Sequence, residues 1–85
     1  NVPNVITPNG DGANDQWVIP NSYSNKSDIT VVIYNTNGQE LFNQTNYQNN
    51  WPGSTMTFLK QSMVFYYVIK NPNETLKQGT ITVIR

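Results

Sequence analysis

Ile29-Thr30-Val31-Val32-Ile33-Tyr34 is the stretch that decides the fold of this 85-residue chain. Every residue in it is β-branched or aromatic, which is typical of a strand. The pair Asn37-Gly38 follows shortly after. Asn-Gly is the strongest short signal of a hairpin, because both residues tolerate a positive φ. With a returning strand over residues 40–44, this part of the chain predicts an antiparallel hairpin.

Two more strands are predicted with similar clarity, over residues 64–69 and 80–84. In the second of these, Ile81 and Val83 share one face and threonines occupy the other, which indicates one buried and one solvated face. Asn71-Pro72-Asn73-Glu74 lies between the two runs and has the composition of a turn. A second hairpin is therefore expected there.

Weaker strand signals occur over residues 4–7 and 16–19, near Trp51, and over residues 57–59. No segment of ten or more residues has the 3.6-residue period of a helix. About seven short strands, spaced near ten residues apart and separated by turns, predict an all-β fold. The expected architecture is an Ig-like antiparallel β-sandwich formed by one domain over residues 1–85, and a small barrel is the alternative.

Two facing sheets are expected to bury the apolar side chains of the predicted strands. The expected core comprises Ile29, Val31, Ile33, Leu41, Trp51, one face of residues 64–69, Ile81 and Val83. The aromatic residues allow another interpretation, since an exposed row of rings can stack on sugars. In a strand, however, Phe65 and Tyr67 share one face while Tyr66 takes the other, so at least part of the set packs in the core.

Composition argues against several classes of function. The chain has no Cys and no His, so it offers neither a Cys/His zinc site nor a Ser-His or Cys-His nucleophile pair. Five acidic and five basic residues are scattered singly and cancel, and the basic stripe of nucleic-acid-binding proteins is missing. No apolar run reaches the length of a transmembrane segment. We expect a domain that binds, anchors or signals and is not an enzyme.

The loop after the first predicted strand is the sharpest candidate for a metal site. Calcium loops place oxygen ligands around a glycine that makes the sharp bend. Asn9, Asp11 and Asp15 occupy plausible ligand positions around Gly12, but two carboxylates predict weak binding at best. The alternative is an Asx-rich turn in which the two aspartates cap backbone N–H groups. A glycosidase-like acid/base pair of Asp11 and Asp15 is disfavoured, because no cleft is expected around them.

Several motifs together resemble one family. Thr7-Pro8-Asn9-Gly10-Asp11-Gly12-Ala13-Asn14-Asp15 is similar to the opening signature of the gliding-motility-associated C-terminal domain of Bacteroidota proteins, the type B sorting domain of the type IX secretion system. The order of later motifs strengthens the resemblance. These motifs are Ile33-Tyr34-Asn35 with Gly38-Gln39 and Leu41-Phe42, Asn50-Trp51 with Gly53, Tyr66-Tyr67-Val68-Ile69-Lys70, and the closing residues 79–85.

The resemblance implies a function in protein transport. It implies a domain at the end of a much larger secreted protein, commonly an adhesin, that is exported through the periplasm and across the outer membrane to the cell surface. The implied partners are the type IX machinery and an outer-membrane protein of the PorP/SprF kind. The recognition residues that we expect from it are Pro8, Asn9, Gly10, Asp11, Gly12, Asn14, Asp15 and Arg85.

A folded sandwich can serve as a tag if a receptor grips its loops or adds a strand to a sheet edge. We expect the last strand, residues 80–85, to provide such an edge beside the Arg85 carboxylate. The competing hypothesis is a generic extracellular Ig-like adhesion or carbohydrate-binding module, since this type of fold hosts many functions.

Overall fold

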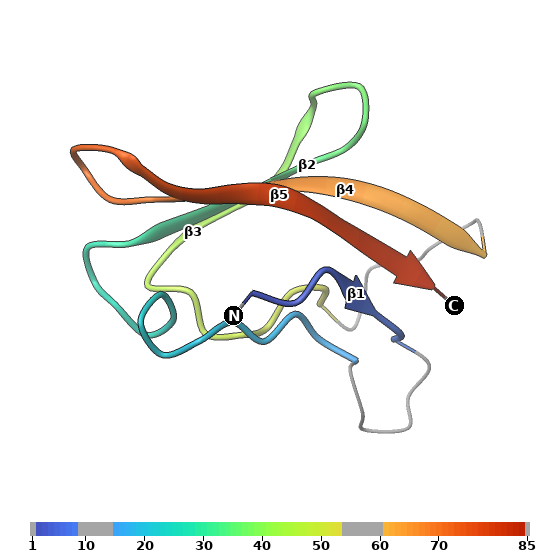
Figure 1. Ribbon diagram of the computed structural model, residues 1–85, viewed down its shortest axis with the longest axis horizontal. Coiled ribbons are helices and arrows are strands. Elements are labelled where there is room, and N and C mark those ends of the chain that lie inside the picture. Colours follow the sequence, from blue (N-terminus) through green and yellow to red (C-terminus); the bar gives the residue numbers. More distant parts are fainter. Residues whose placement is uncertain (1, 9–14, 54–60, 85) are drawn as a thin grey trace.

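The computed structural model describes residues 2–8, 15–53 and 61–84. Their regular structure is entirely β, which confirms the predicted class. The strands are β1 (Val5–Ile6), β2 (Thr30–Tyr34), β3 (Glu40–Thr45), β4 (Ser62–Lys70) and β5 (Thr75–Ile84). They form one sheet in the order β1-β5-β4-β2-β3, in which β1 runs parallel to β5 and all other neighbours are antiparallel (Figure 1).

Both predicted hairpins are confirmed. In the β2–β3 turn the Asn35 side chain accepts the N–H groups of Asn37 and Gln39, each at 2.9 Å. Only Gly38 takes a positive φ, of 83°, so the turn is a three-residue loop in which Asn37 stays in the ordinary region. In the β4–β5 turn the Asn71 side chain accepts the N–H groups of Asn73 and Glu74 in the same way.

The second layer of the fold differs from the prediction. Residues 15–29 and 46–53, which we call the irregular layer, lie against one face of the sheet without forming a ladder (Figure 1). Residues 16–19 and Trp51 belong to this layer, so the strands predicted there are absent, and residues 57–59 lie outside the described part. The described residues therefore form a five-stranded sheet covered by irregular chain, and a sandwich of seven strands is not confirmed.

The core lies between the sheet and the irregular layer. Most of the expected core residues are buried there, including Ile29, Val31, Ile33, Trp51, Ile81 and Val83. Leu41 is a correction, since it is 41% exposed. A bulge between Ile33 and Tyr34 pairs Ile33 with Phe42, so Phe42 takes the inward position and Leu41 is the extra residue. Prediction also missed Trp17, Ile19 and Tyr47, which are buried from the irregular layer.

Candidate recognition surface

β1 and β5 bring the two ends of the chain together. The Thr82 N–H donates to the Asn4 carbonyl at 2.8 Å, and Ile6 lies beside Val83 in the ladder. Two residues after Ile6 the chain reaches Pro8, where the predicted recognition loop begins. Because β1 is parallel to β5, β1 and β5 end at the same end of the sheet (Figure 1). The two segments expected to be recognised therefore continue from neighbouring strand ends.

Trp17 fixes the chain on the far side of that loop. Its side chain is fully buried and its indole N–H donates to the Pro3 carbonyl at 2.8 Å. Its backbone N–H donates to the Trp51 carbonyl at 2.7 Å. The loop is therefore held between β1, which precedes it, and a buried tryptophan that follows it.

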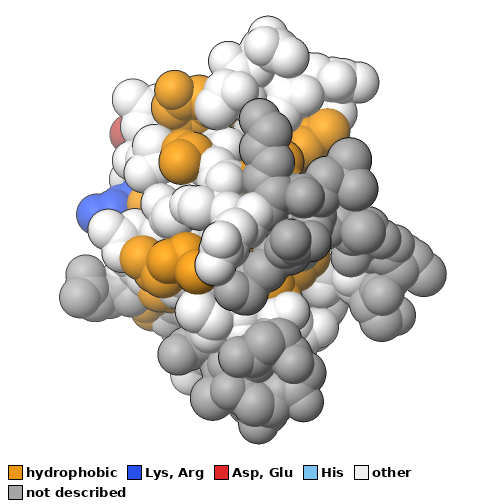
Figure 2. All heavy atoms as spheres, turned by 90° about the vertical axis from the view of Figure 1, so that its right-hand side faces the viewer, with side chains coloured by type: hydrophobic (Ala, Val, Ile, Leu, Met, Phe, Trp, Pro, Cys, Tyr) orange, Lys and Arg blue, Asp and Glu red, His pale blue; other side chains and the backbone are white. Residues whose placement is uncertain are grey.

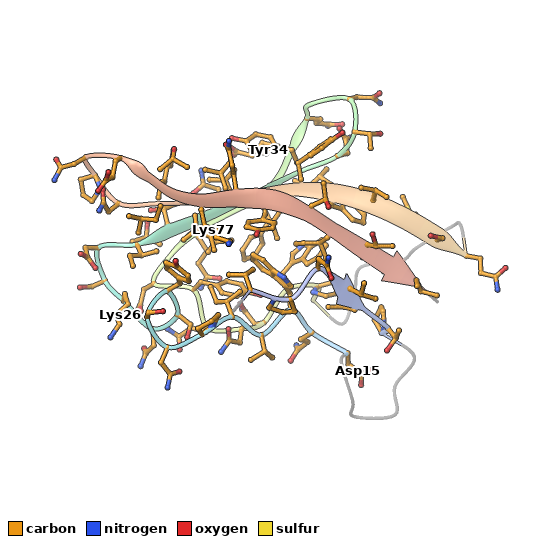
Figure 3. All side chains as sticks on the ribbon, viewed as in Figure 1. Asp15, Lys26, Tyr34 and Lys77 are labelled. Carbon is orange, nitrogen blue, oxygen red and sulfur yellow. The ribbon has the colours of Figure 1, made fainter. Side chains whose placement is uncertain are left out.

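The predicted site residues of the loop are only partly described. Pro8 and Asp15 are half-buried, and Asp15 lies at the β1 end of the irregular layer (Figure 3). The remaining residues of that prediction lie outside the described part of the chain. They are Asn9, Gly10, Asp11, Gly12, Asn14 and Arg85. The calcium site and the alternative Asx-rich turn both remain predictions.

Tyr47 joins the two pieces of the irregular layer beneath this surface. Its buried hydroxyl donates to the Trp17 carbonyl at 2.7 Å and accepts the Trp51 N–H at 3.1 Å. Burial raises the pKa of Tyr47 to about 12, although the hydrogen bond from the Trp51 backbone opposes the shift. The ring also packs against Trp17, with centroids 5.8 Å apart. A single buried tyrosine thus positions both chain segments without any ladder between them.

A group of exposed apolar side chains lies on the opposite face of the sheet, which we call the outer face. Val5 and Val64 flank Thr82 in the ladder, Tyr66 pairs with Thr80, and Ile84 pairs with Ser62. These four apolar residues, the outer patch, are between 39% and 46% exposed. Apolar side chains reach the surface at this end of the molecule (Figure 2). Sequence reasoning missed the patch, because its members come from three separate strands.

The aromatic residues divide between the core and the outer face. Trp17, Tyr47, Trp51, Phe65 and Tyr67 are buried, as expected for part of the set. Burial also raises the pKa of Tyr67, with a further contribution from nearby Tyr23.

Among the described residues, two tyrosines lie on the outer face. Tyr34 and Tyr66 are direct cross-strand neighbours there, with Tyr34 half-buried on β2 (Figure 3). Within this part of the chain they form a pair of rings and not a row.

A shallow hollow of about 360 Å³ lies at the other end of the sheet, near the β4–β5 turn. The residues that line it are Ser27, Asp28, Thr30, Thr45, Lys70, Asn71 and Pro72. None of these residues is aromatic, whereas sugar-binding sites use aromatic rings as platforms. The hollow therefore gives no support to a carbohydrate-binding module.

The described residues show neither a metal-binding cluster nor a membrane-spanning helix. No three of their Asp or Glu side chains gather where they could share an ion. Within the same residues, no helix has the length and apolar character needed to cross a bilayer.

Comparison with known proteins identifies a family. The CHU_C type IX secretion signal domain matches residues 1–83, which is nearly the whole chain. Comparison with curated proteins and with solved structures gives no match. The chain belongs to the type IX secretion signal domain family, as its motifs predicted, and its role is that of a sorting signal read by that secretion system.

Proposed function

Because the chain is a type IX secretion signal domain, we propose that it is the C-terminal tag of a large surface protein, an adhesin, and directs that cargo to the cell surface. The observation that carries the proposal is the family match over residues 1–83. The same resemblance supports an outer-membrane receptor of the PorP/SprF kind. The tag itself does no chemistry in this proposal, which agrees with a sequence that lacks both Cys and His.

We place the recognised surface at the end of the sheet where β1 and β5 meet. The predicted loop begins after β1, β5 ends there at Ile84, and the outer patch adds apolar area on the same strands and on β4. Partly exposed apolar side chains contribute binding free energy when a partner removes them from water. None of the outer patch residues is charged, so the contribution of the patch to affinity is expected to depend little on salt.

The outer patch gives the sharpest test. The chain is fused to the end of a periplasm-directed reporter in a host with a working type IX system. The double variant Val64→Thr with Ile84→Thr keeps β-branched residues but removes apolar area. Full burial of such a side chain contributes about 1.5–3 kcal/mol, and these two are 41% and 39% exposed, so each change should cost about 1 kcal/mol and surface-exposed reporter should fall about tenfold or more. Val18→Thr is the control, since Val18 is 57% exposed but lies between inward-facing Trp17 and Ile19.

Three results would count against the proposal. Export of the double variant at the wild-type level would remove the outer patch from the recognised surface. Equal loss with Val18→Thr would indicate a general effect of exposed apolar area. If the unaltered fusion stays in the periplasm although it is folded, the sorting role in this host fails and the adhesion-module hypothesis takes its place. Arg85→Ala tests the C-terminal charge separately, with loss of export expected if that end is read.

A further inference from the structure

Among the described residues, the sheet has two stretches of free edge. β3 is the last strand in the sheet order and has β2 as its one ladder partner there. On the other side β1 pairs only with Thr82 and Val83 at the end of β5, which leaves residues 75–81 of β5 without a second neighbour. That stretch carries Lys77, a residue type that protects natural edges, so β3 is the better edge for a partner that adds a strand.

The hydrogen-bond register shows which backbone groups of β3 face outward. The Asn46 N–H donates to the Ile29 carbonyl at 2.9 Å, just before the pairing of Thr30 with Thr45. In an antiparallel pair, hydrogen-bonded and non-hydrogen-bonded positions alternate. Gln44 therefore bonds to β2, while the N–H and C=O groups of Asn43 and Thr45 point away from the sheet.

The sequence of β3 does little to block this edge. Natural edge strands are protected by Pro, Lys, bulges or extreme shortness. Here the six residues contain neither Pro nor Lys, and the only charge and the bulge both lie at the hairpin end, near Glu40. Asn43 and Thr45 are exposed at the other end. Only the hairpin end of β3 is therefore protected, and the end with Asn43 and Thr45 stays open to a partner strand.

The side chains along this edge indicate what kind of strand fits. Phe42 faces the core side but is only half-buried, and its ring meets Tyr47 edge-on with centroids 5.8 Å apart. An added strand with an apolar residue opposite Phe42 would complete its burial. Residues 41–45 carry no charge, so nothing there attracts a charged strand.

A second copy of the chain fits this edge less well. Antiparallel self-pairing centred on Asn43 places Gln44 of the second copy opposite Phe42, and pairing centred on Gln44 places Asn46 there. Both arrangements leave the exposed part of Phe42 against a polar side chain. Pairing centred on Phe42 would set this residue against itself, but it requires Leu41, the extra residue at the bulge, to pair with Asn43 in both copies. We propose that β3 receives an uncharged, extended segment of the export machinery, with an apolar residue opposite Phe42, by strand addition. This proposal rests on the sorting function.

Proline gives a test that separates the edge from the fold. Asn43→Pro removes an N–H that points away from β2, a position at which edge strands tolerate proline. The variant should fold, and its surface-exposed reporter should fall at least about tenfold, the equivalent of about 1.4 kcal/mol. Asn43→Ala is the matched control, since it keeps the N–H and should export normally. Thr45→Pro has the same geometry and replaces Asn43→Pro if that variant does not fold.

Site-specific photo-crosslinking from position 43 of the fusion identifies the occupant. An adduct with a component of the export machinery is the expected result. An adduct with a second copy of the chain, normal export of a folded proline variant, or equal loss with Asn43→Ala would each overturn strand addition by that machinery. If Asn43→Pro alone loses export while the outer-patch variant is exported normally, the sorting function stands and recognition lies at β3. If the unaltered, folded fusion stays in the periplasm, both the sorting function and strand addition at β3 are refuted.

Discussion

Tyr47→Phe tests whether hydrogen bonds to one side chain hold the irregular layer on the sheet. The substitution keeps the ring but deletes a buried hydroxyl that bonds to the Trp17 carbonyl at 2.7 Å and to the Trp51 N–H at 3.1 Å. A buried polar group left without its partner costs about 1–3 kcal/mol. Two such groups sum to about 2–6 kcal/mol, and because single substitutions rarely cost more than about 4–5 kcal/mol, we expect a loss of about 2–4 kcal/mol. That is a large part of the roughly 4–13 kcal/mol available to a domain of this size.

Equilibrium urea unfolding followed by tryptophan fluorescence measures the loss, and a thermal scan should show a fall in Tm of roughly 8–30 °C. Tyr66→Phe is the matched control, because Tyr66 is 46% exposed and its hydroxyl can bond to water. Its unfolding free energy should stay within about 0.5 kcal/mol of the wild type. A Tyr47→Phe protein as stable as this control would refute the reasoning, since the two segments would then be held by packing alone.

Three further predictions follow from the same structure. Gly79→Ala should lower the free energy of unfolding by about 1–3 kcal/mol, because the added Cβ would lie 3.0–3.2 Å from the ring and hydroxyl of Tyr67; thermal unfolding measures the loss. Gly53→Ala is the control, since its added Cβ meets no atom within 4 Å and stability should not change. The free energy of unfolding should fall by up to about 2.7 kcal/mol as pH rises from 10 towards 12, because burial raises the pKa of Tyr47 to about 12 and only the folded state keeps its proton in this range. Urea unfolding at several pH values measures this fall. A Tyr47→Phe protein whose unfolding free energy falls equally steeply with pH would contradict the prediction. Millimolar Ca²⁺ should raise the Tm modestly or not at all, since only Asp11 and Asp15 bring charge to the loop, and a rise equivalent to several kcal/mol would contradict that estimate.

Local signals predicted the strands and hairpins of the sheet well. The β-branched run at residues 29–34 and the alternation at 80–84 became β2 and the end of β5. Asx and glycine chemistry marked both turns correctly. These features depend on residues close in sequence, where side-chain pattern and backbone preference agree.

The irregular layer could not be predicted in the same way. Residues 16–19 alternate as a strand would, since Trp17 and Ile19 point inward and Val18 outward. What decides between strand and irregular chain is the partner, and here the Trp17 N–H bonds to Trp51, 34 positions away, by one hydrogen bond and not through a ladder. Sequence pattern shows which face a residue takes, but not whether a neighbouring backbone continues alongside it.

Sequence reasoning identified the family but missed two features of the proposed surface. The motifs predicted the type IX secretion signal domain, and the match over residues 1–83 confirms it. The outer patch was missed because Val5, Val64 and Ile84 become neighbours only through strand order. The edge expected over residues 80–85 was wrong at Thr82 and Val83 for the same reason, since β1 pairs with β5 at these two residues. Strand order depends on long-range pairing, which local patterns do not encode.

A signal built in this way exists only in the folded chain. In the unfolded chain Val5 and Val64 are separated by 58 intervening residues, and no outward row of amides is fixed along β3. If the machinery reads the outer patch and the β3 edge, as we propose, it can do so only from molecules whose sheet has formed. A loss of 2–4 kcal/mol leaves most molecules folded if the wild type has several kcal/mol more than that, because each 1.4 kcal/mol changes the folded-to-unfolded ratio tenfold. Tyr47→Phe should then export normally well below its Tm and fail close to it, whereas Asn43→Pro should fail at every temperature.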